Sequence, residues 1–244
     1  MITVAAVADV HFDSTVRGSL RPGLEELVED ADVLLLPGDL TRLGTVQEAS
    51  ALAEELEGLT VPMYAVLGNH DLHAGHQLGI ATVMARAGVV VLEGDGCTLD
   101  VNGTSVGIVG AKGFGGGFAG ASGSDFGEDE MKAFMRHTKQ VAARVRNALV
   151  ALATDVRIAM LHYSPIAGTL EGERREIYPF LGSHLLADAI DEAGADLVVH
   201  GHAHGGIEEG TTRGGIAVRN VAQPVIRRPA ARYVLDGGKV LTDS

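Results

Sequence analysis

The first thirteen residues, MITVAAVADVHFD (residues 1–13), join an apolar run to two polar side chains. The apolar run over 2–8 predicts a buried β-strand. Asp9 and His11 follow it, and two residues apart on an extended segment their side chains point the same way. No basic residue precedes the apolar part, so we interpret the stretch as the first strand of the fold and not as a signal peptide.

Short apolar runs and helical patterns alternate through the first part of the chain. Such an alternation predicts a largely parallel sheet with right-handed crossover connections. The expected strands lie near residues 2–8, 33–36, 63–67 and 89–92, and the expected helices lie near 22–30, 45–57 and 77–87.

The rest of the chain predicts a mixed arrangement. Asn102-Gly103, a dipeptide favoured in tight hairpin turns, lies between two β-rich runs. A long helix is expected over about 128–152 and a shorter one near 183–192, and the C-terminal segments are β-rich again. No repeat or Pro/Ser-rich linker divides the sequence. We therefore expect residues 1–244 to form a single α/β domain of two packed sheets flanked by helices.

The composition limits the classes of function. The 244 residues are 46% hydrophobic and contain one cysteine, Cys97, which excludes an intramolecular disulfide and favours a cytoplasmic location. No apolar stretch approaches the ~18 residues of a membrane span. The net charge of −13 makes a nucleic-acid partner unexpected. A protein this acidic can bind an anionic substrate only through local positive charge, which bound metal ions would supply.

Polar side chains recur at the carboxyl ends of the expected strands. In α/β sheets, ligand sites form beyond these ends, so five strands deliver side chains to one edge. Carboxylate, imidazole and amide oxygen without thiolate favour Mn, Fe, Ni or Zn over a structural zinc. Asp39, between apolar turns, is suited to bridge two such ions. The polar residues are Asp9 and His11, Asp39, Asn69 with His70 and Asp71, His162, and finally His200, His202 and His204.

The order of these motifs, D-x-H, G-D, G-N-H-D, a lone His and G-H-x-H, resembles the calcineurin-like metallophosphoesterase family, in its bacterial single-domain form. The motifs extend from Asp9 to His204. The resemblance implies a four-layer αββα sandwich of two mixed β-sheets between helices. It implies two metal ions, with His70 as the catalytic histidine. One ion would be held by Asp9, His11, Asp39 and His204, and the other by Asp39, Asn69, His162 and His202.

The sequence departs from the family pattern at one position. Some members carry a second Asp three residues after the bridging one, where it pairs with the catalytic histidine, and this chain has Arg42 there. The group that orients His70 is then either Asp71 or a backbone carbonyl. His200 is not needed as a ligand, and we expect it to pack or to support a ligand.

The expected reaction is hydrolysis of a phosphoester by a hydroxide that bridges the two ions, with His70 donating a proton to the leaving group or stabilising it. We expect a phosphodiesterase acting on a small-molecule or nucleotide phosphoester. The alternatives are a phosphomonoesterase, a nuclease, which the acidic charge disfavours, or a non-catalytic scaffold. Nothing in the sequence predicts an oligomeric state.

A glycine-rich segment over 112–127 has two interpretations. It contains seven glycines but lacks the spacing of a nucleotide-binding P-loop, because Lys112 comes too early. It is either a flexible surface connection or a mobile flap over the metals. In a flap, Phe114 and Phe118 would offer stacking surfaces to the substrate.

Overall fold

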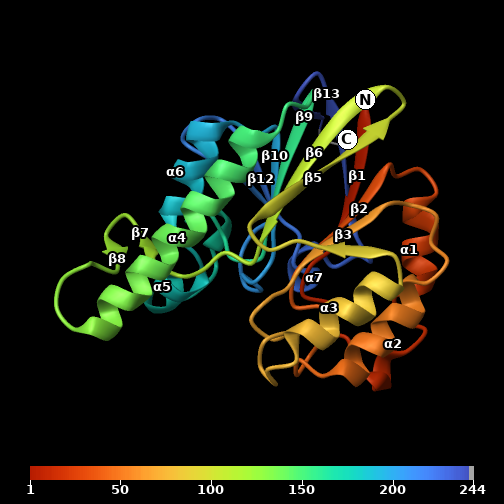
Figure 1. The fold of residues 1–244 in the computed structure, drawn as a ribbon, viewed down its shortest axis with the longest axis horizontal. Helices are drawn as coiled ribbons and strands as arrows, with labels where there is room; N and C mark the ends of the chain where they lie inside the picture. The colour runs from red at the N-terminus through yellow and green to blue at the C-terminus, as the bar shows by residue number, and fades with distance from the viewer. Residues whose placement is uncertain (242–244) are drawn as a thin grey trace.

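The computed structural model describes residues 1–241 and shows two six-stranded sheets packed face to face, with helices on the outer faces (Figure 1). The first sheet has the order β14-β13-β1-β2-β3-β4. Strands β1 to β4 are parallel to one another, and β13 is antiparallel to both of its neighbours, β1 and β14. Its strands are β1 (Ile2–Ala6), β2 (Val33–Pro37), β3 (Met63–Val66), β4 (Val89–Val91), β13 (Ala231–Asp236) and β14 (Lys239–Leu241), and its connecting helices are α1 (Arg21–Val28), α2 (Val46–Leu56) and α3 (Gln77–Arg86).

The second sheet has the order β11-β12-β10-β9-β6-β5, with four parallel central strands and an antiparallel strand at each edge. Helices α4 (Asp129–Ala151) and α6 (His184–Ala193) lie on its outer side, opposite α1, α2 and α3 (Figure 1). The strands are β5 (Asp95–Val101), β6 (Thr104–Ala111), β9 (Val156–Leu161), β10 (Leu197–His200), β11 (Glu209–Thr211) and β12 (Ala217–Asn220). The expected sandwich of two mixed sheets between helices is confirmed.

Strand alternation places the apolar side chains of the second sheet in two layers of core, one on each face. On β6, Ile108 points into the space between the sheets, whereas its neighbour Val109 packs under the outer helices. Val141, Val145 and Leu149 of α4 are buried at helical spacing and close this outer layer. The stacking of helix, sheet, sheet and helix follows from these two periodicities.

Local signals in the sequence explain several boundaries. Thr45 and Glu48 form a capping box at the start of α2, in which each side chain accepts from the other residue's backbone N–H. Asn102 and Gly103 both have positive φ, 51° and 84°, as a tight hairpin turn between β5 and β6 requires.

The glycine-rich segment differs from both interpretations. Gly113 and residues 115–118 are buried, and the Phe118 ring is only 4% exposed, packed in a cluster with Leu170, Leu181 and Ala203. Phe118 is therefore part of the core and not a stacking surface for substrate. The sequence expectation was wrong because glycine allows close backbone approach as well as mobility: a Cβ on Gly117 would collide with the Ala121 carbonyl. Only residues 119–127 form an exposed connection.

Smaller elements complete the chain, and they lie near the carboxyl ends of the parallel strands or on the helix layer. They are the hairpin β7 (Gly117–Phe118) and β8 (Ala121–Ser122), the helices α5 (Tyr178–Leu181) and α7 (Gln223–Ile226), and the short 3-10 turns Ser14–Val16, Gly168–Leu170 and Arg175–Ile177. Within residues 1–241, no helix combines the length and apolarity needed to cross a bilayer.

Candidate metal centre

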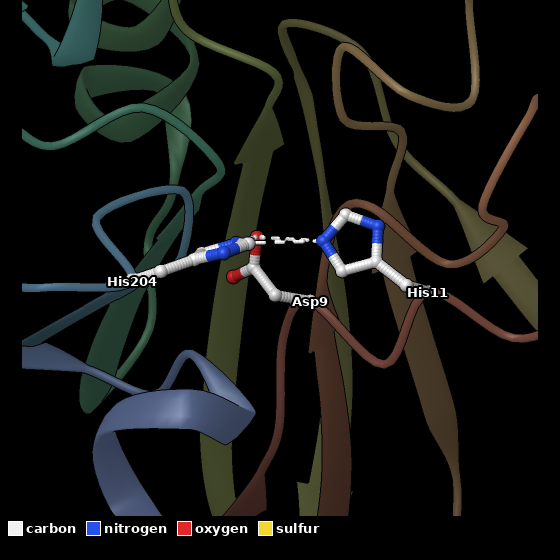
Figure 2. Close-up of side chains that lie close together, drawn as sticks. All are labelled: Asp9, His11 and His204. Carbon is white, nitrogen blue, oxygen red and sulfur yellow. Dashed lines mark hydrogen bonds and ion pairs between the residues drawn. The ribbon is translucent and has the colours of Figure 1, made fainter.

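The first group of candidate ligands joins the end of β1 to the segment after β10. Figure 2 shows the Asp9 carboxylate and the rings of His11 and His204 converging from distant parts of the chain. Asp9 Oδ1 lies 2.9 Å from His204 Nε2, and His11 Nε2 lies 3.4 Å from His204 Nε2. One ligand atom from each residue falls within 4.8 Å of the others, so one ion can contact all three.

The second group lies beside it, at the ends of β2, β3, β9 and β10. Asp39, His162 and His202 also place ligand atoms within 4.8 Å of one another. Asn69 belongs to the same group, because its Oδ1 is 3.0 Å from His162 Nε2. These are carboxylate, imidazole and amide ligands without a thiolate.

Asp39 lies between the two groups. Its Oδ2 is 3.8 Å from His11 Nε2, and its Oδ1 is 3.4 Å from His162 Nε2. The carboxylate, only 1% exposed, thus presents one oxygen to each side. The structure brings all seven sequence-predicted ligands together, with Asp39 in the position of a bridge.

The donor set can be tested against a metal through His162. Its Nδ1–H donates to the Pro37 carbonyl (3.0 Å), so Nε2 carries a lone pair. That lone pair faces the Asn69 carbonyl oxygen, a second acceptor, at 3.0 Å. Two lone-pair acceptors 3.0 Å apart repel each other unless a cation binds to both. His162 Nε2 and Asn69 Oδ1 therefore fit a bound metal ion. Similarly, His202 Nε2–H donates to the Phe180 carbonyl (3.1 Å), which leaves Nδ1 free to bind an ion.

Burial keeps three of the four candidate histidine ligands in the metal-binding form. It lowers the pKa of His11 to about 4 and that of His202 to about 3, and the pKa of His162 falls well below its ordinary value for the same reason. These rings are therefore neutral at neutral pH, as metal ligation requires. Burial also raises the pKa of Asp9 to about 6, and the hydrogen bond to Asp9 raises the pKa of His204. A buried carboxylate of this kind is stabilised by a neighbouring cation.

Several residues at the centre have a positive φ, a backbone conformation that residues other than glycine seldom adopt. Among residues 1–241, six non-glycine residues have positive φ, and four are candidate ligands. Gly201 is required for a different reason, because a Cβ there would collide with the Asp9 carboxylate. Strain of this kind concentrates at functional sites. The four are Asp9 (57°), His11 (41°), Asp39 (50°) and His202 (70°).

His70 lies at the open side of the cluster. Its ring is 44% exposed, its Nε2 is 4.0 Å from Asp39 Oδ2, and its ring centroid is 4.5 Å from that of His11. Its Nδ1–H donates to the Arg42 carbonyl (2.8 Å). Of the two expected orienting groups, the backbone carbonyl is therefore the one present.

Asp71 has a different role from the one considered for it. It is fully buried and accepts from the backbone N–H groups of Leu40, Thr41 and Gly68. Asp71 thus ties the loop after β2 to the loop after β3, and it does not orient His70. The Arg42 side chain points to Asp13 (3.1 Å).

His200 is packed, as expected. Its Nδ1–H donates to the Gly201 carbonyl (2.7 Å), and its Nε2 accepts from the Thr169 hydroxyl (2.8 Å). It is fully buried and supports the segment that carries His202 and His204.

The sequence did not reveal several supporting groups. Backbone carbonyls have no residue signature, so the sequence could not show which carbonyls hold His70, His162 and His202. Glu173 accepts from the Gly205 N–H (2.6 Å), and Asn220 donates to the Ala203 carbonyl (2.8 Å). Both hold the loop after β10, and neither belongs to a motif.

Comparisons with known proteins give a match to a family and to several solved structures. The family model of the calcineurin-like phosphoesterases matches residues 2–206. No curated protein matches the chain in sequence.

Solved structures share the fold at low sequence identity. The chain is similar to the phosphopantetheinyl hydrolase of Mycobacterium tuberculosis, with a TM-score of 0.66 and 18% identity over 92% of this chain and 90% of that one. For a putative 5′-nucleotidase from Staphylococcus aureus, the TM-score is 0.58 and the identity 14%, over 99% of this chain and 52% of that one. For the NAD nucleotidase of Haemophilus influenzae, the TM-score is 0.53 and the identity 16%, over 90% of this chain and 44% of that one. The chain thus spans about half the length of both nucleotidases.

Proposed function

The chain belongs to the calcineurin-like phosphoesterase family, and on that premise we propose that it hydrolyses a phosphodiester of a small molecule or nucleotide with two bound transition-metal ions. The observation that carries the proposal is the position of Asp39, which presents one carboxylate oxygen to each of two ligand groups. A lone ion needs no such shared carboxylate between two sets of histidines.

The proposed ligand sets are those of the two groups, with Asp39 common to both. Bound there, the ions would neutralise phosphoryl charge and lower the pKa of a water between them. Mn, Fe, Ni and Zn all suit this donor set. One ion would be held by Asp9, His11, Asp39 and His204, and the other by Asp39, Asn69, His162 and His202.

His70 is the proposed general acid. Because its Nδ1 is held by the Arg42 carbonyl, Nε2 is the nitrogen that faces the cluster. A proton on Nε2 can pass to the oxygen of a leaving group bound beside Asp39. The ring is partly exposed, so its protonation can be restored from solvent.

The test uses purified protein loaded with Mn²⁺, Ni²⁺ or Zn²⁺. Hydrolysis of bis(p-nitrophenyl) phosphate is compared with that of p-nitrophenyl phosphate, and metal content is measured by elemental analysis. We expect two ions per chain and a higher kcat/KM for the diester. Asp39→Asn should lose both metal and activity, while Asp100→Asn, an exposed change at the β5–β6 hairpin, should retain both. A wild-type protein that binds metal and hydrolyses neither ester would overturn the proposal, and preference for the monoester would make the protein a phosphomonoesterase.

A further inference from the structure

Lys112 lies beside the candidate centre, although it belongs to no metal motif. It follows β6 directly, and β6 pairs in parallel with β9, the strand that leads to His162. The Lys112 carbonyl accepts the N–H groups of His162 (3.0 Å) and Tyr163 (2.9 Å). The backbone therefore fixes Lys112 next to a proposed metal ligand.

The Lys112 ammonium lies over two aromatic rings. It is 5.1 Å from the centroid of Phe114 and 5.0 Å from that of Tyr163, within cation–π range. Its one hydrogen bond among residues 1–241 is to the neighbouring Gly113 carbonyl, at 3.3 Å. Phe114 in turn packs against Phe134 of α4 (5.1 Å between centroids), so the rings form a fixed platform.

The acid that contacts Lys112, Glu93, is engaged by the backbone of that residue and by a second cation. Glu93 accepts the backbone N–H of Lys112 (3.2 Å) and receives the Arg144 guanidinium (3.4 Å). Within the described part of the chain, the Lys112 ammonium has no ion pair with a carboxylate closer than 4.0 Å. Burial lowers the pKa of Lys112, against the opposing effects of Glu93 and Asp39. A partly buried cation without a counter-ion is costly, and an anionic ligand would remove that cost.

Tyr163 connects this cation to the centre. Its ring centroid lies 4.3 Å from that of His202 and 5.6 Å from that of His162. Burial raises the pKa of Tyr163 to about 12, and the charge of Asp39 adds to this rise. A single ring, that of Tyr163, thus lies between the ammonium and His202.

Two other cations near the motifs are already paired. Arg17 contacts Glu54 (3.0 Å) and Arg42 contacts Asp13 (3.1 Å). In a chain of net charge −13, Lys112 is thus a cation held beside the centre without a carboxylate of its own.

We propose that Lys112, on the platform of Phe114 and Tyr163, binds a second anionic group of the substrate, beside His162 and His202. The preferred substrates are then phosphoesters that carry a carboxylate or a further phosphate on one arm. The inference rests on the proposed function, because it places the scissile phosphate at the metal centre.

The experiment compares two diesters with the same leaving group, 4-nitrophenyl phenyl phosphate and 4-nitrophenyl 4-carboxyphenyl phosphate. Wild-type protein should show the higher kcat/KM for the carboxylated ester. Lys112→Met, which removes the charge and keeps an unbranched chain, should lower that value by roughly 10-fold or more, as loss of a charge-assisted hydrogen bond does. It should leave kcat/KM for the ester without the carboxylate within about twofold of the wild-type value. Lys112→Arg should restore most of the preference.

A binding measurement separates this inference from the proposed function. Calorimetry on metal-loaded protein, with phenylphosphonate and 4-carboxyphenylphosphonate as probes, requires no turnover. Lys112→Met should abolish the tighter binding of the carboxylated probe, whereas Lys139→Met, a matched change on the exposed side of α4, should not. Equal binding of the two probes by wild type would overturn the subsite. So would a Lys112→Met protein that loses thermal stability and both activities equally, because it would show a structural role. Failure to hydrolyse either ester, with the binding difference intact, would overturn only the proposed function.

Discussion

Each of three histidines at the centre donates one ring N–H to a backbone carbonyl, which leaves its other ring nitrogen for metal binding or proton transfer. This arrangement fixes the tautomer and the direction of each ring without a second carboxylate. It also explains why Arg42 is tolerated where some family members carry an acid, since the carbonyl of that residue, and not its side chain, holds His70. The pairs are His162 with Pro37, His202 with Phe180, and His70 with Arg42.

Replacement of His70 should separate metal binding from chemistry. His70 lies outside both proposed ligand sets, so His70→Asn should keep two ions per chain by elemental analysis. If it is the general acid, kcat should fall by roughly 10²–10⁴-fold on an alkyl ester and by much less on a p-nitrophenyl ester, whose leaving group needs no proton. His73→Asn, an exposed change three residues away, is the control and should retain wild-type kinetics. Equal losses on both esters would contradict the acid role.

His200 should make stability depend on pH. Burial lowers its pKa to about 4, whereas an unfolded histidine titrates near 6.5. Between these values the unfolded chain binds one proton more than the folded chain. His200 alone should therefore raise the free energy of unfolding by roughly 1.4 kcal/mol per pH unit as pH increases from about 4.5 to 6.

Urea denaturation of metal-free protein at several pH values between 4.5 and 6.5 measures this effect. His200→Asn, which can still donate to the Gly201 carbonyl, should show a shallower rise of stability with pH than wild type. The exposed His73→Asn should retain the wild-type slope. Identical slopes in all three proteins would show that His200 does not titrate as its burial implies.

The candidate ligands were predictable from the sequence because each is a polar residue placed directly after an apolar strand. His162 and His202 are far apart in the chain, yet parallel strands bring their carboxyl ends to one edge. A backbone carbonyl was one of the two groups expected to orient His70, but which carbonyls hold the histidines, and the role of Glu173, were not predictable. A carbonyl has no side-chain identity, and Glu173 lies in a loop whose path depends on tertiary packing.

At the scale of elements, the segment after β6 shows where composition is ambiguous. Its glycines are compatible with mobility, but in the folded chain Gly116 and Gly117 let the backbone pass close to β8 and α6. The burial of Phe118 in an apolar cluster shows that this part of the segment is packed and not mobile. No periodic pattern in the sequence predicts that burial. Strands and helices were more predictable, because their apolar spacing directly encodes the buried face.

Phe118→Ala should therefore be a stability variant. Removal of a buried phenylalanine typically costs about 3–5 kcal/mol, so the melting temperature should fall clearly. KM for a phosphodiester should change little, because the ring does not face solvent. Phe126→Ala, in the exposed half of the same segment with its residue 88% exposed, is a matched control and should leave the melting temperature nearly unchanged. A raised KM without loss of stability would support the flap after all.

At the scale of the molecule, the centre lies across both sheets. The first sheet supplies Asp9, His11, Asp39 and Asn69, and with them every carboxylate of the two proposed ligand sets. The second sheet supplies the histidines that follow β9 and β10. The ions would thus connect two layers that otherwise meet through apolar side chains. They would also concentrate positive charge at one edge of a chain whose net charge is −13.

Metal loading should consequently stabilise the whole fold. Asp9 and His204 are 195 positions apart, so the unfolded chain cannot present them together, and the ions bind almost only the folded form. A free metal concentration 100 times the dissociation constant would add about 2.7 kcal/mol to the free energy of unfolding for each site. The melting temperature should therefore rise with Mn²⁺ and fall with a chelator. Asp39→Asn should lose this dependence, and Asp100→Asn should keep it. A melting temperature that responds to Mn²⁺ equally in wild type and Asp39→Asn would mean that the ions bind elsewhere, and that the two sheets are held together without them.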